Sequence, residues 1–235
     1  GFIYHPADLA LVTVSDKLYR PLLEPVDLRF FFTGYLRFQA AEDPALEREL
    51  EAWLGGETAP VLSFGSVTFA DVRAVAERFA RHWPRGRKLI LQSGWAGFEA
   101  VAERPEIKLA GKVSHDQLFR HASAIIHHGG AGTTASALHS GRPQVVVPHI
   151  ADQPFWAAQV ERLGAGVTLA RRHWPERLAG TLDALAADRD RQAKARQCAD
   201  ILAREDGPSR AVKRLEAYVS GQATAPARTK AGAAP

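Results

Sequence analysis

Short apolar runs alternate with amphipathic stretches along residues 61 to 170. The apolar runs are VLSFGSV (61–67), KLILQSG (88–94), IKLAGKV (107–113), SAIIHH (123–128), PQVVVP (143–148) and GVTLA (166–170). Between most of them lie stretches with helical spacing, namely DVRAVAERFARHW (71–83), HDQLFRHA (115–122), TTASALHSG (133–141) and DQPFWAAQVERLG (152–164). Strands that alternate with helices are typical of βαβ units. The pattern therefore predicts an α/β fold, a Rossmann-like parallel sheet with helices on both faces.

Further elements are expected on either side of this region. LRFFFTGYL (28–36) is strand-like, and the remaining helical patterns cover 41–54, about 174–187, about 188–204 and about 207–219. Pro44 suits the first turn of the first of these helices. Ser209 is the expected N-cap of the last.

Composition narrows the class of protein. The chain has 235 residues and is 46% hydrophobic, which is enough for a substantial core. No apolar run approaches the roughly 20 residues that span a bilayer, and no signal-peptide pattern is present. The net charge is +4 with arginines scattered among acids, which argues against a nucleic-acid partner. The single cysteine, Cys198, provides neither a disulfide framework nor a metal cluster, and we expect a reducing, cytoplasmic location without stable membrane insertion.

Candidate chemistry follows the predicted strands. In open parallel sheets, ligands bind outside the carboxyl ends of the strands, where GSV, HHGGAGTT and HIADQ stand here. HHGGAGTT joins a strand to a helix that we expect to begin at Thr133 or Thr134. Gly130 and Gly132 allow close backbone approach, and the free amides of the helix start form an anion site suited to phosphate.

The two adjacent histidines of this motif are not equivalent. Neighbouring residues of a strand face opposite sides of the sheet, so at most one of His127 and His128 shares the ligand's side. His128 adjoins the glycine turn, where even a neutral imidazole can donate one hydrogen bond to a phosphate. A packed histidine that bonds a backbone group is the expected role of His127, and the same structural role stays open for His128.

Two other strand ends contribute candidates. Asp152 and Gln153 stand directly before Pro154, at or beside a helix start, where Asp152 is either a helix cap or, with Gln153, a ligand for vicinal sugar hydroxyls. Ser66 follows a glycine in the turn after the first strand of the sheet and is either an ordinary turn residue or a phosphate ligand. His149 is expected to be a loop residue.

Several other chemistries are disfavoured. GGAGTTAS lacks the lysine of a P-loop, no G-x-S-x-G elbow is present, and the histidines form no HExxH-like pair, so a metal site is not indicated. Gly130-x-Gly132-x-x-Ala135 matches the dinucleotide fingerprint, and Asp152 lies about 20 residues further on. That match is weak because the loop does not follow the first strand, but it keeps a nicotinamide-dependent oxidoreductase as an alternative.

The run HHGGAGTTASALHSGRPQVVVPHIADQPFWAAQVERLGAG (127–166) resembles the donor-binding signature of nucleotide-sugar-dependent glycosyltransferases of the GT-B fold. FTGY (32–35), VLSFGSV (61–67) and GKVSHDQLFRHASAIIHHGGAG (111–132) precede it in the order of that family. The chain looks most like the bacterial antibiotic and natural-product enzymes and the sterol glucosyltransferases. The similarity covers about residues 26 to 220.

The resemblance implies a role for each candidate residue. The donor diphosphate would be held by His128, Gly130, Gly132, Thr133 and Ser66. Val113 would meet the nucleobase through its backbone, and Asp152 with Gln153 would bind the hydroxyls of the transferred sugar. The co-substrate would be a UDP- or dTDP-sugar, with no cofactor and no metal.

One position departs from the family pattern. Plant members carry a glutamate eight residues after the motif histidine, which grips the ribose, and Ser136 stands there in this chain. Ribose recognition is therefore expected to be weaker or made elsewhere, and the choice between UDP and dTDP stays open.

The resemblance also implies two segments. Residues 1–55 would be the end of an N-terminal domain with a linker and short helix, and 56–220 the donor-binding domain. The composition of residues 221–235, which offer nothing to bury, predicts a disordered tail. Because the sequence contains no methionine, we expect a fragment or a processed chain. The catalytic base and the site for a small-molecule or lipid acceptor would lie in the N-terminal half. The expected function is that of an inverting hexosyltransferase; a non-catalytic nucleotide-sugar-binding module of a partner transferase is the alternative.

Overall fold

The computed structural model describes residues 9–19, 30–37, 40–65, 72–92, 103–111 and 113–222. Contacts divide the chain into two units, which are Ala40–Asp200 and the combination of Gly1–Gln39 with Ile201–Pro235. The larger unit holds every candidate site residue.

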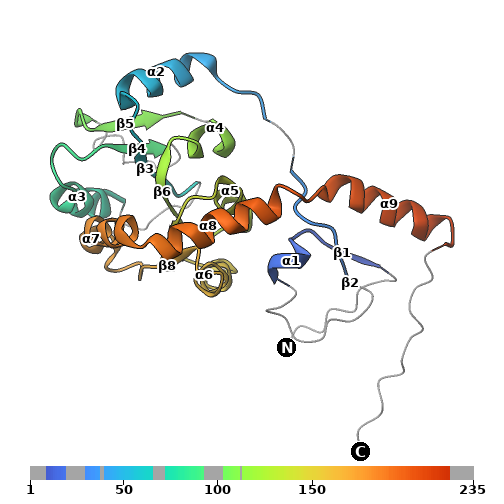
Figure 1. Ribbon diagram of the computed structural model, residues 1–235. Coiled ribbons are helices and arrows are strands. Elements are labelled where there is room, and N and C mark those ends of the chain that lie inside the picture. The colour runs from blue at the N-terminus through green and yellow to red at the C-terminus, as the bar shows by residue number, and fades with distance from the viewer. Residues whose placement is uncertain are drawn as a thin grey trace, which may run out of the picture. The chain divides into compact units, whose positions relative to one another are not determined.

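Six parallel strands form the sheet of the larger unit (Figure 1). They are β3 (Ala59–Ser63), β4 (Leu89–Gln92), β5 (Ile107–Ala110), β6 (Ala122–His127), β7 (Gln144–Val146) and β8 (Gly166–Thr168). Their order is β5-β4-β3-β6-β7-β8, so the first and the fourth strands along the chain are neighbours at the centre. This is the order of doubly wound nucleotide-binding folds. The predicted α/β class is confirmed.

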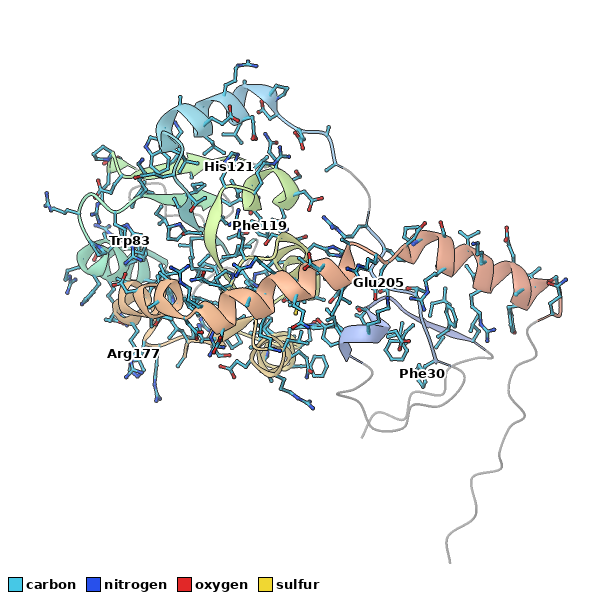
Figure 2. All side chains as sticks on the ribbon, in the orientation of Figure 1. Phe30, Trp83, Phe119, His121, Arg177 and Glu205 are labelled. Atoms are coloured by element: carbon cyan, nitrogen blue, oxygen red, sulfur yellow. The ribbon has the colours of Figure 1, made fainter. Side chains whose placement is uncertain are left out.

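Helices cover both faces of this sheet (Figure 1). One face carries a core cluster with α3 (Val72–His82) and α7 (Trp174–Ala187), and the other carries a cluster with α2 (Pro44–Leu54), α4 (His115–Phe119) and α5 (Ala131–Ser140). Trp83 belongs to the first cluster and Phe119 to the second (Figure 2). α6 (Gln153–Arg162) and α8 (Arg189–Leu202) complete the unit.

The sequence explains the bounds of α2. The Asp43 carboxylate accepts hydrogen bonds from the amides of Ala45 and Leu46, and Pro44 occupies the first turn, as predicted. Gly55 ends the helix in the left-handed conformation, with φ 62°. The apolar face of α2 is buried in the second core cluster, so this helix packs with the sheet.

The smaller unit combines both ends of the chain. It contains β1 (Ala10–Val12), α1 (Asp16–Tyr19), β2 (Phe30–Phe32) and α9 (Gly207–Val219). β1 and β2 pair in parallel, and the Arg210 guanidinium on α9 donates to the carbonyl of Phe32 over 2.9 Å. The predicted division at residue 55 stays a prediction, and most of the tail expected to be disordered lies outside the described residues.

The predicted cap of α9 is wrong. Asp206, and not Ser209, is the N-cap residue, and its carboxylate accepts the amide hydrogen of Ser209 over 3.0 Å. The Ser209 hydroxyl donates to the same carboxylate over 2.6 Å. The helix begins at Gly207 with Pro208 in its first turn, which leaves the preceding acid in the capping position.

His127 is a buried polar residue at the end of β6, one of the two central strands of the sheet. Its ring is fully buried, Nε2 donates to Oε1 of Gln144 on β7 over 2.9 Å, and Nδ1 accepts the amide hydrogen of Gly129 over 3.1 Å. Burial lowers the pKa of His127 to about 3 against a smaller opposing effect of the Gln144 hydrogen bond. His127 is therefore a neutral histidine with a fixed tautomer, and its expected structural role is confirmed.

A substitution in α2 tests whether this helix is part of the core. Leu50 is fully buried, so Leu50→Ala should lower the free energy of unfolding by about 2–5 kcal/mol through lost contacts and a cavity. Arg48→Ala, an exposed change on the same helix, should alter it by less than about 0.5 kcal/mol. Chemical denaturation of the full chain measures both, and equal effects would show that α2 does not pack as described.

The buried His127 also predicts a dependence of stability on pH. Its folded-state pKa is depressed below the value of about 6.5 in an unfolded chain, so the unfolded state binds the extra proton first. Stability is complete above about pH 6.5 and falls toward pH 3 by about 1.4 kcal/mol per pH unit for this residue. Denaturation between pH 7 and pH 4.5 should therefore show a shallower loss for His127→Gln than for the wild type. Parallel curves would contradict a neutral, buried His127.

Candidate functional site

The neighbouring strands β3 and β6 mark the point where the chain changes direction across the sheet. From β3 the chain winds outward through β4 and β5, and from β6 it winds the other way through β7 and β8. The connections after β3 and β6 therefore lead to strands on opposite sides of this pair, and doubly wound folds bind ligands in the crevice at the carboxyl ends of the strands at such a point. The HHGGAGTT motif stands at this point.

The turn between β6 and α5 requires its glycines. Gly129 has φ 88°, and a Cβ there would lie 2.8 Å from Val146 Cγ1. Gly130 is the N-cap residue of α5, and the first hydrogen bond of the helix runs from the Thr134 amide to the Gly130 carbonyl over 2.9 Å. The expectation that α5 begins at Thr133 or Thr134 is wrong, because Ala131 and Gly132 already adopt helical geometry in the first turn.

The earlier helix start changes which amides are available. The amides of Ala131, Gly132 and Thr133 precede the first internal hydrogen bond of α5, so they have no acceptor within the helix. Gly132 lies at the exposed helix start, with open space where a Cβ would stand. Three aligned donors and the positive end of the helix dipole form an anion-binding geometry.

His128 lies against this turn. A Cβ on Gly130 would be only 2.5 Å from His128 Nε2, so the imidazole reaches this position only because residue 130 is a glycine. The ring is partly buried, and Nδ1 completes no hydrogen bond among the described residues. Burial lowers the pKa of His128, while the Asp152 carboxylate and the Ser63 carbonyl oppose that shift. A bound anion would further favour the protonated ring.

The loop between β7 and α6 places Asp152 and Gln153 differently. Asp152 is exposed at the N-cap position of α6, makes no capping bond, and accepts the indole N–H of Trp156 at Oδ2 over 2.7 Å. Gln153 is buried, and its Oε1 accepts the amide hydrogens of His149 and Ile150 over 2.7 and 3.1 Å. Asp152 therefore faces outward, whereas the Gln153 side chain holds the loop in shape. Their sugar-binding roles stay predictions.

Val113 follows β5 on the other side of the crevice. Its carbonyl accepts Nε2–H of Gln92, at the end of β4, over 2.8 Å. Ser66 lies outside the described residues, so its predicted phosphate contact stays a prediction.

Four polar residues that the sequence analysis did not select also belong to these strand ends. They are Ser63, Gln92, His115 and His149. His115, His127 and His149 each experience the charge of His128, which lowers their pKa values after the larger effect of burial. The pKa of His149 falls to about 4, with Arg171 contributing more than His128. Each of the four lies at or just after a predicted strand, and this position is the sequence feature that could have identified them.

Two general properties of the described residues bear on function. None of their groups of histidine, cysteine, aspartate and glutamate side chains could hold a metal ion, and none of their helices is long and apolar enough to cross a membrane. Cys198 is buried in α8, and burial raises the pKa of its thiol to about 11, which keeps it protonated.

Solved structures share this architecture. CalG4, the calicheamicin glycosyltransferase, matches with a TM-score of 0.70 at 22% identity over 93% of this chain and 55% of its own. The glycosyltransferase of kitacinnamycin matches with a TM-score of 0.67 at 25% identity over 89% of this chain and 54% of its own. VinC, crystallised with dTDP, matches with a TM-score of 0.63 at 22% identity over 80% of this chain and 47% of its own.

Curated relatives are closer in sequence. Glycosyltransferase GtfE and vancomycin aglycone glucosyltransferase, both from Amycolatopsis orientalis, are 41% and 38% identical over 169 and 170 residues. These matches cover 71% of this chain and 39% of each relative, so the chain spans about two fifths of their length. A sterol 3-beta-glucosyltransferase from Cryptococcus neoformans is 32% identical over 172 residues, which cover 66% of this chain and 11% of that enzyme.

The family model described as "Erythromycin biosynthesis protein CIII-like, C-terminal domain" matches residues 96–218, which include the glycine turn, α5 and the Asp152 loop. The chain therefore belongs to this family, which comprises the C-terminal domains of GT-B glycosyltransferases.

Proposed function

We propose that this chain is the donor-binding half of an inverting glycosyltransferase that moves a hexose from a UDP- or dTDP-sugar to a hydroxyl group of a lipophilic or natural-product acceptor. The observation that carries the proposal is the turn between β6 and α5. There His128 and the unpaired amides at the start of α5 lie together beside the central crevice. Inversion and the hexose are what the family resemblance implies.

The turn is suited to the leaving group of such a reaction. When the bond between sugar and diphosphate breaks, negative charge develops on the diphosphate. The amides of Ala131, Gly132 and Thr133 and the imidazole of His128 are donors already in place for that charge. Because the negative charge on the diphosphate grows as the bond breaks, these fixed donors stabilise the transition state more than the ground state.

The sugar would lie toward the β7–α6 loop. Asp152 Oδ2 is held by the indole of Trp156, which orients the carboxylate and leaves Oδ1 for a sugar hydroxyl. Gln153 would contribute its Nε2, because its Oε1 already accepts two loop amides. The nucleobase would lie at the opposite end of the crevice, beside Val113.

The relatives support this class of substrates. The names of two of them state glucosyl transfer to a vancomycin aglycone and to a sterol, and the VinC structure contains dTDP. We propose an acceptor of comparable size and low polarity. The base that deprotonates it is expected outside this chain, and Ser136, which is partly buried on α5, replaces the ribose-binding glutamate of plant members.

Nucleotide binding tests the proposal. The full chain should bind UDP or dTDP, and His128→Ala should weaken binding by about 1–3 kcal/mol, roughly a 5- to 150-fold rise in Kd, because it removes a hydrogen bond to a charged group. Titration calorimetry at pH 7.5 measures both proteins. No binding of either nucleotide to the wild type at millimolar concentration would refute the proposal.

His127→Gln is the matched control, since this histidine faces the interior and should affect affinity less. If the folded His127 variant loses more affinity than the His128 variant, the two roles are reversed. Gly130→Ala tests the contribution of the His128 ring to nucleotide affinity in a second way. The added methyl group displaces the His128 ring and should weaken binding without removing any polar group.

A further inference from the structure

A hydrogen-bonded network connects three strand ends on the nucleobase side of the crevice. The Ser63 hydroxyl at the end of β3 lies 2.5 Å from Oε1 of Gln92 at the end of β4. Gln92 Nε2 donates to the Val113 carbonyl over 2.8 Å, and His115 Nε2 lies 3.4 Å from the Ser63 hydroxyl oxygen. The network therefore joins β3, β4, the loop after β5 and the first residue of α4.

The sheet register brings these residues together. Leu62 pairs with Leu91, so the residues that follow, Ser63 and Gln92, are also neighbours across the two strands. Leu62 and Leu91 face the core cluster of α3 and α7, so Ser63 and Gln92 point to the opposite face, where α4 begins. Ser63 is almost fully buried, at 1% exposure. Apolar side chains would fill this place at a lower desolvation cost, so the presence of a polar network indicates a role other than packing.

Only one assignment of donors and acceptors is consistent with all the hydrogen bonds of the network. Because Gln92 uses Nε2 to hold Val113, its Oε1 faces Ser63 and accepts the hydroxyl hydrogen. The Ser63 oxygen is then free to accept Nε2–H of His115. The His115 ring is stacked on Phe119, with centroids 4.7 Å apart and planes at 9°. Burial lowers the pKa of His115, which favours the neutral ring that this arrangement requires.

We propose that Gln92 and Ser63, supported by His115, are positioning residues for the nucleobase. They fix the orientation of the Val113 carbonyl, so that the backbone at this position presents a constant pattern of donors and acceptors to the edge of a uracil or thymine. This inference rests on the proposed function, because it assumes a nucleoside diphosphate in the crevice. Gln92 and Ser63 act through Val113 and need no contact with the reacting atoms.

Loss of the network should weaken binding of the nucleobase and leave binding of the phosphates unchanged. Gln92→Met keeps the side-chain volume and removes both hydrogen bonds. It should raise the Kd for UDP about tenfold and leave the Kd for inorganic pyrophosphate within about twofold. Titration calorimetry of the full chain with the two ligands measures this split. Ser63→Ala should show the same split to a smaller extent, since it leaves the bond from Gln92 to Val113.

Gln117→Met is the matched control. Gln117 is a fully buried glutamine on α4, whereas Gln92 is partly buried, and it bonds Asp43 at the start of α2, away from the strand ends. Its loss should reduce stability without changing either Kd. The inference is overturned if folded Gln92→Met binds UDP as the wild type does, or if it loses pyrophosphate affinity to the same degree. A wild-type chain that binds neither ligand would instead refute the proposed function.

Discussion

The parallel pairing of β3 with β6 is the constraint on which the rest of the site depends. In register, Leu62 stands beside Ile126 and Ser63 beside His127, so the two strands end at the same level. Successive connections run outward in both directions from this pair, and doubly wound folds bind ligands in the crevice that such a reversal of strand order creates at the carboxyl ends. The crevice is therefore a consequence of strand order, and the side chains after the two strands determine what it binds.

Strand alternation then separates the two histidines of the motif. His127 is the last residue of β6. Its Nε2 hydrogen-bonds the Gln144 side chain on β7, and its Nδ1 accepts the amide hydrogen of Gly129. His128, one residue later, lies at the surface of the turn, against Gly130. One histidine shapes the turn that the other uses. Two glycines also shape this turn. Gly129 supplies the positive φ that the turn needs, and Gly130 leaves room for the His128 imidazole.

The fold was predictable from the sequence, whereas parts of the site were not. Short apolar runs and helical spacings are local patterns, and they located β3 to β8 with their helices. The start of α5 was missed because glycines at 130 and 132 suggest a loop, although a helix tolerates glycine in its first turn. The inward direction of Gln153 depends on two backbone amides of its own loop, which no pattern shows. Gln92 and His115 lie 29 and 52 positions after Ser63 along the chain, and only the fold brings the three together.

If a nucleoside diphosphate binds with its phosphates at the start of α5, the amides of that turn must sense it. Amide chemical shifts of the 15N-labelled chain, followed during titration with UDP, report on each of them. We expect the largest changes at Ala131, Gly132 and Thr133, together with a change in the ring nitrogen signals of His128 and a smaller one at His127. Saturable binding whose largest changes fall at the amino ends of the strands, with residues 128–133 unaffected, would contradict it.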